Sequence, residues 1–160
     1  MKKTILFLFL LTLAFSACEK DDICLLPNTP NLILRFYDST DLTEVKSVDR
    51  LSIWADGKDT ISNYKSVTLD SIVIPLNVNA TETVYHFKMN STSGNVADNK
   101  YNKITITYTP EDVYVSRSCG YKTIFNDVSI TSDNGWVHSF TPSTLTTIDH
   151  ETAAHVQIFH

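Results

Sequence analysis

The sequence has little glycine and lacks the short motifs that mark common catalytic sites. Only four of its 160 residues are glycine. They form neither a G-x-S-x-G nucleophile turn nor a glycine-rich phosphate loop with its lysine. A glycine-spaced calcium loop is missing as well. We therefore expect no cofactor and no enzyme activity.

A basic cluster is also missing. The chain carries 13 basic and 18 acidic residues, a formal net charge of −5. Two of the basic residues, Lys2 and Lys3, lie in a segment that we expect to be removed, so the mature chain would be more acidic still. Such a surface repels nucleic acid and anionic membranes. We expect no nucleic-acid partner.

The longest apolar run is too short to span a membrane. Lys2 and Lys3 precede the run "TILFLFLLTLAF", and the small residues Ser16 and Ala17 follow it. Secretory signal peptides have this order, whereas a spanning helix needs about 20 apolar residues. Ser16 and Ala17 before Cys18 resemble the bacterial lipobox, in which a peptidase cuts before the cysteine. Residues 1–17 are therefore expected to be a lipoprotein signal peptide, and Cys18 to carry a covalent lipid that anchors the chain in a bilayer.

One position departs from the lipobox pattern. Phe15 stands three places before Cys18, where an aliphatic residue is usual, and ordinary signal cleavage after Ser16 is the alternative. Cysteine is scarce, with three residues in the chain, and a secreted protein with an odd number needs an explanation. Lipidation of Cys18 leaves an even pair, which favours the lipoprotein interpretation.

The remaining cysteines, Cys24 and Cys119, would lie in an oxidising compartment, where disulfides persist. If "DVYVSRSC" is a strand, Cys119 shares its apolar face with Val113 and Val115. A disulfide then forms if the N-terminal segment passes that face. Two separate buried thiols are the alternative.

Alternation of apolar and polar residues runs through most of the chain after residue 30, and no helical period competes with it. We expect about eight strands with turn signals between them, which indicates one all-β domain. An antiparallel β-sandwich of the immunoglobulin or transthyretin kind is the predicted fold, and a soluble closed barrel is the alternative. The predicted strands lie at residues 31–38, 51–56, 72–78, 85–89, 104–108, 113–115, 122–130, 135–140 and 154–159. Residues 18–30 would be a lipidated, acidic tether, and residues 31–160 the sandwich.

Two prolines refine this prediction. Pro75 lies within the strand of Ile72, Ile74 and Leu76, which favours an edge strand or a bulge. Pro110 takes the second position of "TPED", which suits a type I turn between two strands.

Histidines and acids offer weak candidates for a metal site. His150 and His155 in "DHETAAH" are five residues apart, so neither a helix nor a strand would place both on one ion. The acidic residues Asp38, Asp41 and Glu44 match a solvated turn better than a calcium site. We predict no metal.

The two tryptophans are candidate contacts for a sugar. Trp54 has the parity opposite to Leu51 and Ile53, so we expect its side chain to point away from the core. Trp136 follows Gly135 at a turn signal and is also expected near the surface. One exposed aromatic on a sheet is ordinary, so these residues support only an alternative function.

Two resemblances to known proteins indicate where the protein is located. The charged residues behind Cys18 (Glu19, Lys20, Asp21, Asp22) resemble the signal that sends Bacteroidota lipoproteins to the cell surface, although a simple charged tether is the alternative. The pattern "CEKDDICLLPNTPNLILRFYD", then "RSCGY" and a final "AHVQIFH", resembles an uncharacterised family of small Bacteroidota lipoproteins. That resemblance implies the Cys24–Cys119 pair and supplies no activity.

The same pattern contains two arginines near the paired cysteines. Arg35 and Arg117 are expected to lie close together, either as a recognition site or, more simply, as structural partners of an acidic neighbour. The predicted function is that of a non-enzymatic lipoprotein of the outer membrane, exposed on the cell surface or facing the periplasm. It would act by contact with an outer-membrane β-barrel or another envelope protein. A surface module that binds glycan or peptide is the alternative, and an enzyme is a distant third.

Overall fold

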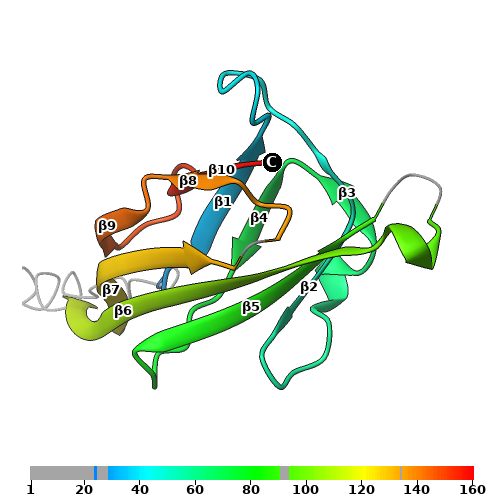
Figure 1. Cartoon of the computed structure of the whole chain (residues 1–160). Coiled ribbons are helices and arrows are strands. Elements are labelled where there is room, and N and C mark those ends of the chain that lie inside the picture. The colour runs from blue at the N-terminus through cyan, green and yellow to red at the C-terminus, as the bar shows by residue number, and fades with distance from the viewer. Residues whose placement is uncertain (1–23, 25–28, 91–93, 134) are drawn as a thin grey trace, which may run out of the picture.

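The computed structural model describes Cys24 and residues 29–90, 94–133 and 135–160. These residues contain ten strands and two single-turn 3₁₀ helices, joined by loops. Two sheets pack face to face, which confirms the predicted sandwich (Figure 1). Among the described residues, no helix is long and apolar enough to cross a membrane.

The smaller sheet has four strands in the order β4-β1-β10-β8. Its members are β1 (Leu32–Tyr37), β4 (Ser71–Ile74), β8 (Ser139–Thr141) and β10 (Val156–Phe159). β1 and β10 run parallel, with Leu34 opposite Val156, whereas the other pairs of this sheet are antiparallel. The purely antiparallel arrangement that we predicted therefore has one exception. Side-chain alternation specifies the faces of a strand and not its direction.

The larger sheet has six strands in the order β3-β2-β5-β6-β7-β9. Its members are β2 (Val48–Ala55), β3 (Val67–Leu69), β5 (Glu82–Met89), β6 (Lys100–Ser116), β7 (Gly120–Ser132) and β9 (Thr144–Ile148). The 3₁₀ helices are η1 (Ser62–Tyr64), between β2 and β3, and η2 (Val96–Asp98), before β6. Prediction missed the short strands β3 and β9: β3 has only three residues, and three of the five residues of β9 are threonines.

Pro75 lies just beyond the end of a strand, and Pro110 lies inside one. β4 is an edge strand that ends at Ile74, so Pro75 stands just outside it, as the edge prediction required. Pro110 is not in a turn: β6 continues through it and pairs Pro110 with Phe125. The amide of Tyr108 donates to the carbonyl of Thr81 on the β5 side, and a strand alternates its amides, so the Pro110 nitrogen faces that same side. β5 pairs with β6 only as far as Thr107, so no strand lies on that side of Pro110. The N–H group that proline lacks is therefore not needed for a hydrogen bond between strands.

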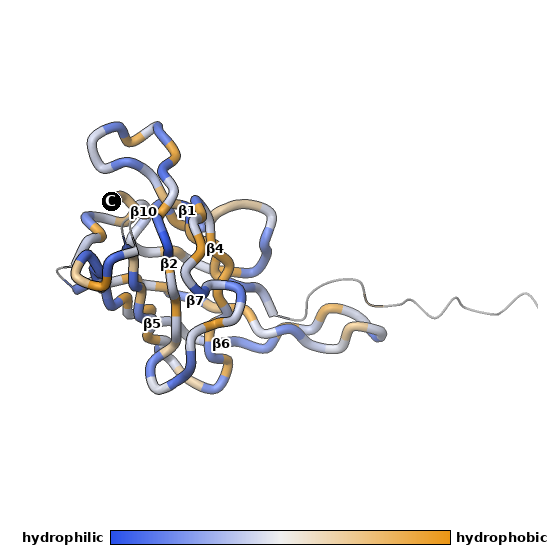
Figure 2. Tube along the Cα trace, turned by 90° about the vertical axis from the view of Figure 1, so that its right-hand side faces the viewer, coloured by the Kyte–Doolittle hydropathy of each residue, from blue (hydrophilic) through white to orange (hydrophobic). Residues whose placement is uncertain are grey.

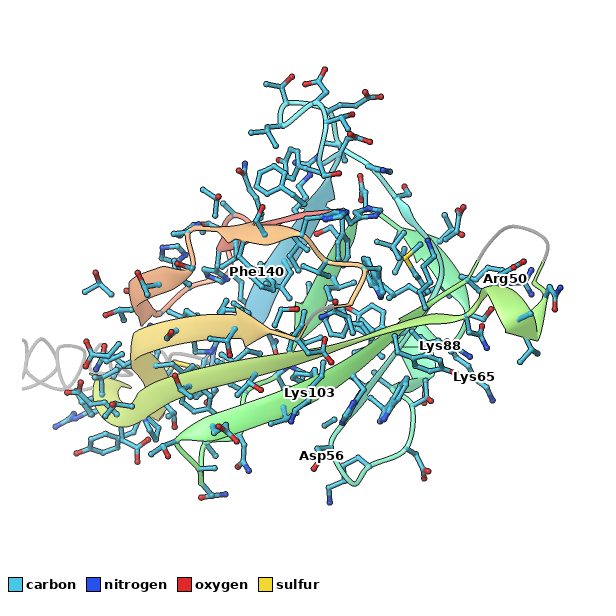
Figure 3. The ribbon with its side chains drawn as sticks, in the orientation of Figure 1. Arg50, Asp56, Lys65, Lys88, Lys103 and Phe140 are labelled. Carbon is cyan, nitrogen blue, oxygen red and sulfur yellow. A yellow bond between two sulfur atoms is a disulfide. The ribbon has the colours of Figure 1, made fainter. Side chains whose placement is uncertain are left out.

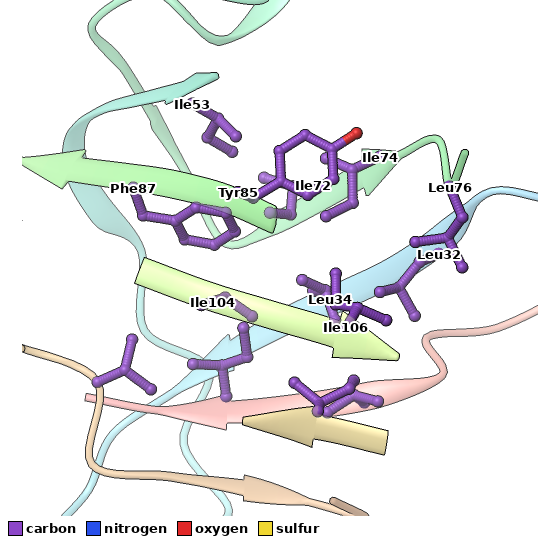
Figure 4. Packing of buried hydrophobic residues seen from close by; sticks show 14 of the residues in the cluster. Leu32, Leu34, Ile53, Ile72, Ile74, Leu76, Tyr85, Phe87, Ile104 and Ile106 are labelled. Carbon is purple, nitrogen blue, oxygen red and sulfur yellow. The ribbon is translucent and has the colours of Figure 1, made fainter. Parts of the chain in front are cut away.

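The core fills the space between the sheets (Figure 4). Leu34 and Phe36 of β1 face Phe87 of β5 and Ile104 of β6, and all four side chains are fully buried. Buried Tyr85 joins the sheets through a polar contact as well, because its hydroxyl donates to the carbonyl of Pro75 at 2.6 Å. Burial raises the pKa of Tyr85 to about 12, so this hydroxyl stays protonated at any physiological pH.

Candidate functional site

A hairpin of β6 and β7 extends beyond the sandwich and is the most distinctive surface of the molecule (Figure 2). β5 pairs with β6 only as far as Thr107, and β9 pairs with β7 only from Phe125 onward. Residues 109–124 continue past both neighbours as a two-stranded ribbon. We call these residues the hairpin arm.

The base of the arm is bent and fixed by hydrogen bonds. Between the pairs Thr107–Ser129 and Thr109–Asn126, β7 contains one more residue than β6. This β-bulge includes Asp127, whose φ is 51°, and bulges bend and twist a strand. The carboxamide of Asn126 donates to Glu111 at 2.6 Å and accepts from Thr147 of β9 at 2.8 Å. The arm is thus attached to the larger sheet in a defined direction.

Two tyrosines lie opposite each other near the end of the arm. Tyr114 pairs with Tyr121, and their rings meet edge to face with centroids 5.5 Å apart. Alternation places Tyr114 on the same side of β6 as Tyr108, which is buried against Phe125. Tyr108 belongs to the buried core cluster, whereas Tyr114 and Tyr121 lie outside it and are 60% and 65% exposed. They form a ready aromatic contact surface.

The end of the arm is closed by a turn and a disulfide. Cys24 and Cys119 are joined with an S–S distance of 2.06 Å, which confirms the predicted pair. Cys119 lies in the turn and not on a strand, and it is half-buried, because the hairpin turns at residues 117–119 instead of at Pro110. Its amide donates to the hydroxyl of Ser116 at 3.1 Å. Gly120 follows with φ 68°, a left-handed conformation that glycine adopts without strain.

The two arginines that we expected to lie close together are on different elements of the fold. Arg35 lies on the outer face of β1, with its guanidinium 5.9 Å from the ring centre of Tyr37. Arg117 is exposed in the turn of the arm. Within the described part of the chain neither arginine forms an ion pair with an acidic neighbour.

Trp136 is buried, contrary to the prediction that it lies near the surface. It is 8% exposed and packs against Phe36 and His160, at 6.2 and 5.4 Å between ring centres. The buried side chain of Asn102 accepts from the amide of Val137 at 3.1 Å and holds this segment against β6. Gly135 permits the close approach, since a Cβ there would lie 2.2 Å from the Asn102 oxygen. Gly135 therefore serves a close contact with Asn102 as well as a tight bend, in which its amide donates to the carbonyl of Asp133 at 2.9 Å.

Trp54 lies on the outer face of the larger sheet, as its parity predicted. Its indole stacks on the imidazole of His86, with ring centres 5.4 Å apart and planes 14° apart. His86 is held in turn by the carboxylate of Asp56 at 2.8 Å. Trp54 is therefore a fixed aromatic surface, and its role as a ligand contact stays a prediction.

The histidine and acidic clusters are occupied by structural hydrogen bonds. His155 Nδ1 accepts from the amide of Ile33 at 2.9 Å, and its Nε2 donates to the carbonyl of His150 at 2.8 Å. Asp38 accepts from the amides of Thr40 and Asp41 within its own loop and pairs with Lys46 at 2.8 Å. The bond from Lys46, followed by those within the loop, holds the pKa of Asp38 well below its usual range. In the described residues, no group of three or more potential ligands is placed to hold a metal ion.

The predicted anchor and export signal lie outside the described residues. These are Cys18 and the charged residues Glu19, Lys20, Asp21 and Asp22. They remain predictions from the sequence.

Fold and surface together define a two-sheet β-sandwich with a disulfide-closed hairpin arm. The chain belongs to a family of unknown function (DUF6452), whose model matches residues 50–160. That match covers most of the sandwich and all of the arm, and it carries no activity. Comparison with curated proteins and with solved structures finds no significant match.

Proposed function

We propose that the protein is a lipid-anchored accessory protein of a Bacteroidota outer membrane, and that it acts through protein contact made by the hairpin arm. The disulfide carries this proposal. Cys119, at the end of the arm, is bonded to Cys24, and only six positions separate Cys24 from the proposed lipid site at Cys18. Six residues span at most about 20 Å. A lipid on Cys18 therefore keeps the end of the arm close to the bilayer.

The chemistry of the arm suits a protein partner that is embedded in that membrane. Tyrosine is enriched at protein contacts because it combines apolar area with a polar hydroxyl. Both strands of the arm also have a side on which no described strand pairs, and a partner strand can add there by main-chain hydrogen bonds. An outer-membrane β-barrel or another envelope protein fits these features. The proposal includes no catalytic step and no cofactor apart from the covalent lipid.

Affinity purification tests the partner. The tagged full-length protein is purified from gently solubilised membranes, and a partner in constant ratio is expected to come with it. The double variant Tyr114→Ser/Tyr121→Ser should lose that partner. Leu42→Ser is the matched control, because Leu42 is 59% exposed in the loop between β1 and β2 and should keep it.

Melting temperatures of the three proteins separate loss of contact from loss of folding. If the double variant folds and still brings down the partner, contact through the tyrosines is refuted, and if the wild type brings down none, contact through the arm is refuted.

A second experiment tests the cell-surface location. Replacing Lys20, Asp21 and Asp22 with alanine should leave the protein lipidated and in the outer membrane, because Cys18 is untouched. Protease added to intact cells should then no longer reach it. Equal access in the variant, or none in the wild type, would reduce these charges to a tether and favour a periplasm-facing protein.

A further inference from the structure

The outer face of β2, β5 and β6 carries a hollow of about 540 Å³ beside Trp54. Three lysines and one aspartate line it, although the whole chain has more acids than bases. These lysines are Lys58, Lys65 and Lys88, and the aspartate is Asp59. Figure 3 shows Lys65 and Lys88 on this face, with Lys103 further along the sheet. We call this feature the lysine hollow.

The floor of the lysine hollow is set by strand register. Ser52, Lys88 and Tyr101 lie opposite one another on β2, β5 and β6, so their side chains form a row on one face. Lys88 is half-buried there, and none of the ion pairs in the described parts of the chain involves it. Asp59 lines the same hollow but forms no ion pair with Lys88, so a carboxylate ligand could add a charge-assisted hydrogen bond there.

The wall of the lysine hollow is the segment after β2. This segment folds back over the strand through a bridge between Trp54 and Thr60. Further along, the amide of Ser66 donates to the hydroxyl of Ser52 at 3.0 Å. The wall that includes Lys58 and Lys65 is thus held against β2 by hydrogen bonds of its main chain.

Trp54 supplies a flat apolar surface on one side. Trp54 lines the hollow and His86 does not, so the imidazole leaves a part of the indole facing the ligand space. The C–H groups on one face of a pyranose ring pack against such a surface, because the face of an aromatic ring is slightly negative. Lysine ammonium groups bind carboxylates by charge-assisted hydrogen bonds.

We propose that the lysine hollow binds a carboxylate-bearing sugar unit of an acidic polysaccharide. Trp54 stacks on the sugar ring, Lys65 and Lys88 bind its carboxylate, and the hydroxyl-bearing lining, Thr60 and Ser66, faces the sugar hydroxyls. An acidic peptide would have carboxylates but no rigid ring to pack on the indole. This surface is separate from the hairpin arm, so its test is independent of the proposed protein contact.

The probe is a hexamer of α-1,4-linked galacturonate, measured by calorimetry with the full mature protein in mild detergent. The fully methyl-esterified hexamer is the neutral control with the same rings. We expect the acidic hexamer to bind at least about tenfold more tightly than its ester and to weaken as salt is raised.

Variants locate the site. Lys65→Gln/Lys88→Gln should weaken the acidic hexamer by at least about tenfold, whereas Lys103→Gln, on the same face but outside the hollow, should change it less than about threefold. Trp54→Ala should weaken it similarly to the double variant, and Trp54→Phe should restore part of the loss.

Several results overturn the proposal. They are equal binding of the ester, equal binding of hexaglutamate or of an oligonucleotide of the same charge, equal loss in Lys103→Gln, and no binding by the wild type. A melting temperature for each variant shows whether a loss reflects unfolding, and Trp54→Phe keeps the test valid if Trp54→Ala does not fold.

Discussion

The hairpin arm and the body of the sandwich are made of the same strands but are stabilised in different ways. In the body, Phe87 and Ile104 are fully buried between two sheets. In the arm, Tyr114 continues β6 and Tyr121 lies opposite it on β7, and most of the surface of both side chains is exposed. Positions of the strand that face the core within the body are therefore exposed in the arm.

The contrast also shows what replaces a core in the arm. Ladder hydrogen bonds, the turn at residues 117–119 and the disulfide hold its shape. A two-stranded hairpin is at best marginally stable by itself in water, and the arm is attached at both ends. Hydrogen bonds of Asn126 beside the bulge hold its base, and the Cys24–Cys119 disulfide holds its end.

The largest expected effect comes from removing that disulfide. Cys24→Ser/Cys119→Ser opens a link between residues 95 positions apart, and the chain-entropy model gives a loss of up to about 4 to 5 kcal/mol in the free energy of unfolding. Urea unfolding of the variant and the wild type measures it. In the unreduced, unfolded wild type, neither Cys24 nor Cys119 should react as a free thiol, and two reactive thiols there would contradict the link.

Aromatic truncation compares body and arm directly. Phe87→Ala should lower the free energy of unfolding by about 3 to 5 kcal/mol, because it removes a fully buried ring and leaves a cavity. Tyr121→Ala, which removes an exposed ring, should change it by no more than about 0.5 kcal/mol. Denaturant unfolding of both variants tests the contrast. Equal losses would mean that the arm contributes to the core.

The two regions also differ in how well the sequence predicted them. In the body, alternation correctly placed Leu34, Ile74 and Phe87 inside, because one face of each strand is buried and the period of two reports it. In the arm, alternation continues although neither face is fully buried. The presence of Pro110 led us to predict the hairpin turn at the wrong position. The true turn at residues 117–119 has a weaker local signal.

The features of the candidate sites that we did not predict depend on contacts between residues far apart in the sequence. The disulfide was predictable because the chain has only three cysteines, one of which was expected to carry a lipid. The opposition of Tyr114 and Tyr121 depends on the register of β6 and β7, which was fixed by the unrecognised turn. Lys65 and Lys88 lie far apart in sequence and meet only through the fold, and burial of Trp136 depends on the distant Asn102.

A smaller effect concerns the pH dependence of the stability, which should come from histidines in the body and not from the arm. The five histidines all lie in the body, and residues 109–124 contain none. Burial lowers the pKa of His155 from its usual 6.5, so the unfolded chain takes up a proton at a higher pH than the folded one. Stability from this residue is therefore complete above about pH 7.5 and falls as pH drops below 6.5.

The variant His155→Asn tests this assignment, because its amide oxygen can still accept from the amide of Ile33. The free energy of unfolding should fall less between pH 7.5 and pH 5.0 in the variant than in the wild type. His160, whose pKa is lowered by burial as well, should leave a residual slope. Identical slopes in both proteins would place the pH dependence elsewhere.

The smallest effect concerns Pro110 at the base of the arm. If Pro110 began a tight turn, its fixed φ would preorganise that turn, and replacing it would cost about 0.4 to 1 kcal/mol. Here it lies inside β6 with its nitrogen toward the unpaired side, and threonine suits a strand at least as well. Pro110→Thr should therefore leave the free energy of unfolding within about 0.5 kcal/mol of the wild type. The new amide, however, makes this edge of the arm a better template for a partner strand. Tighter retention of the membrane partner together with unchanged stability would show that the arm binds through its free strand edge, and unchanged retention would assign the contact to the tyrosines alone.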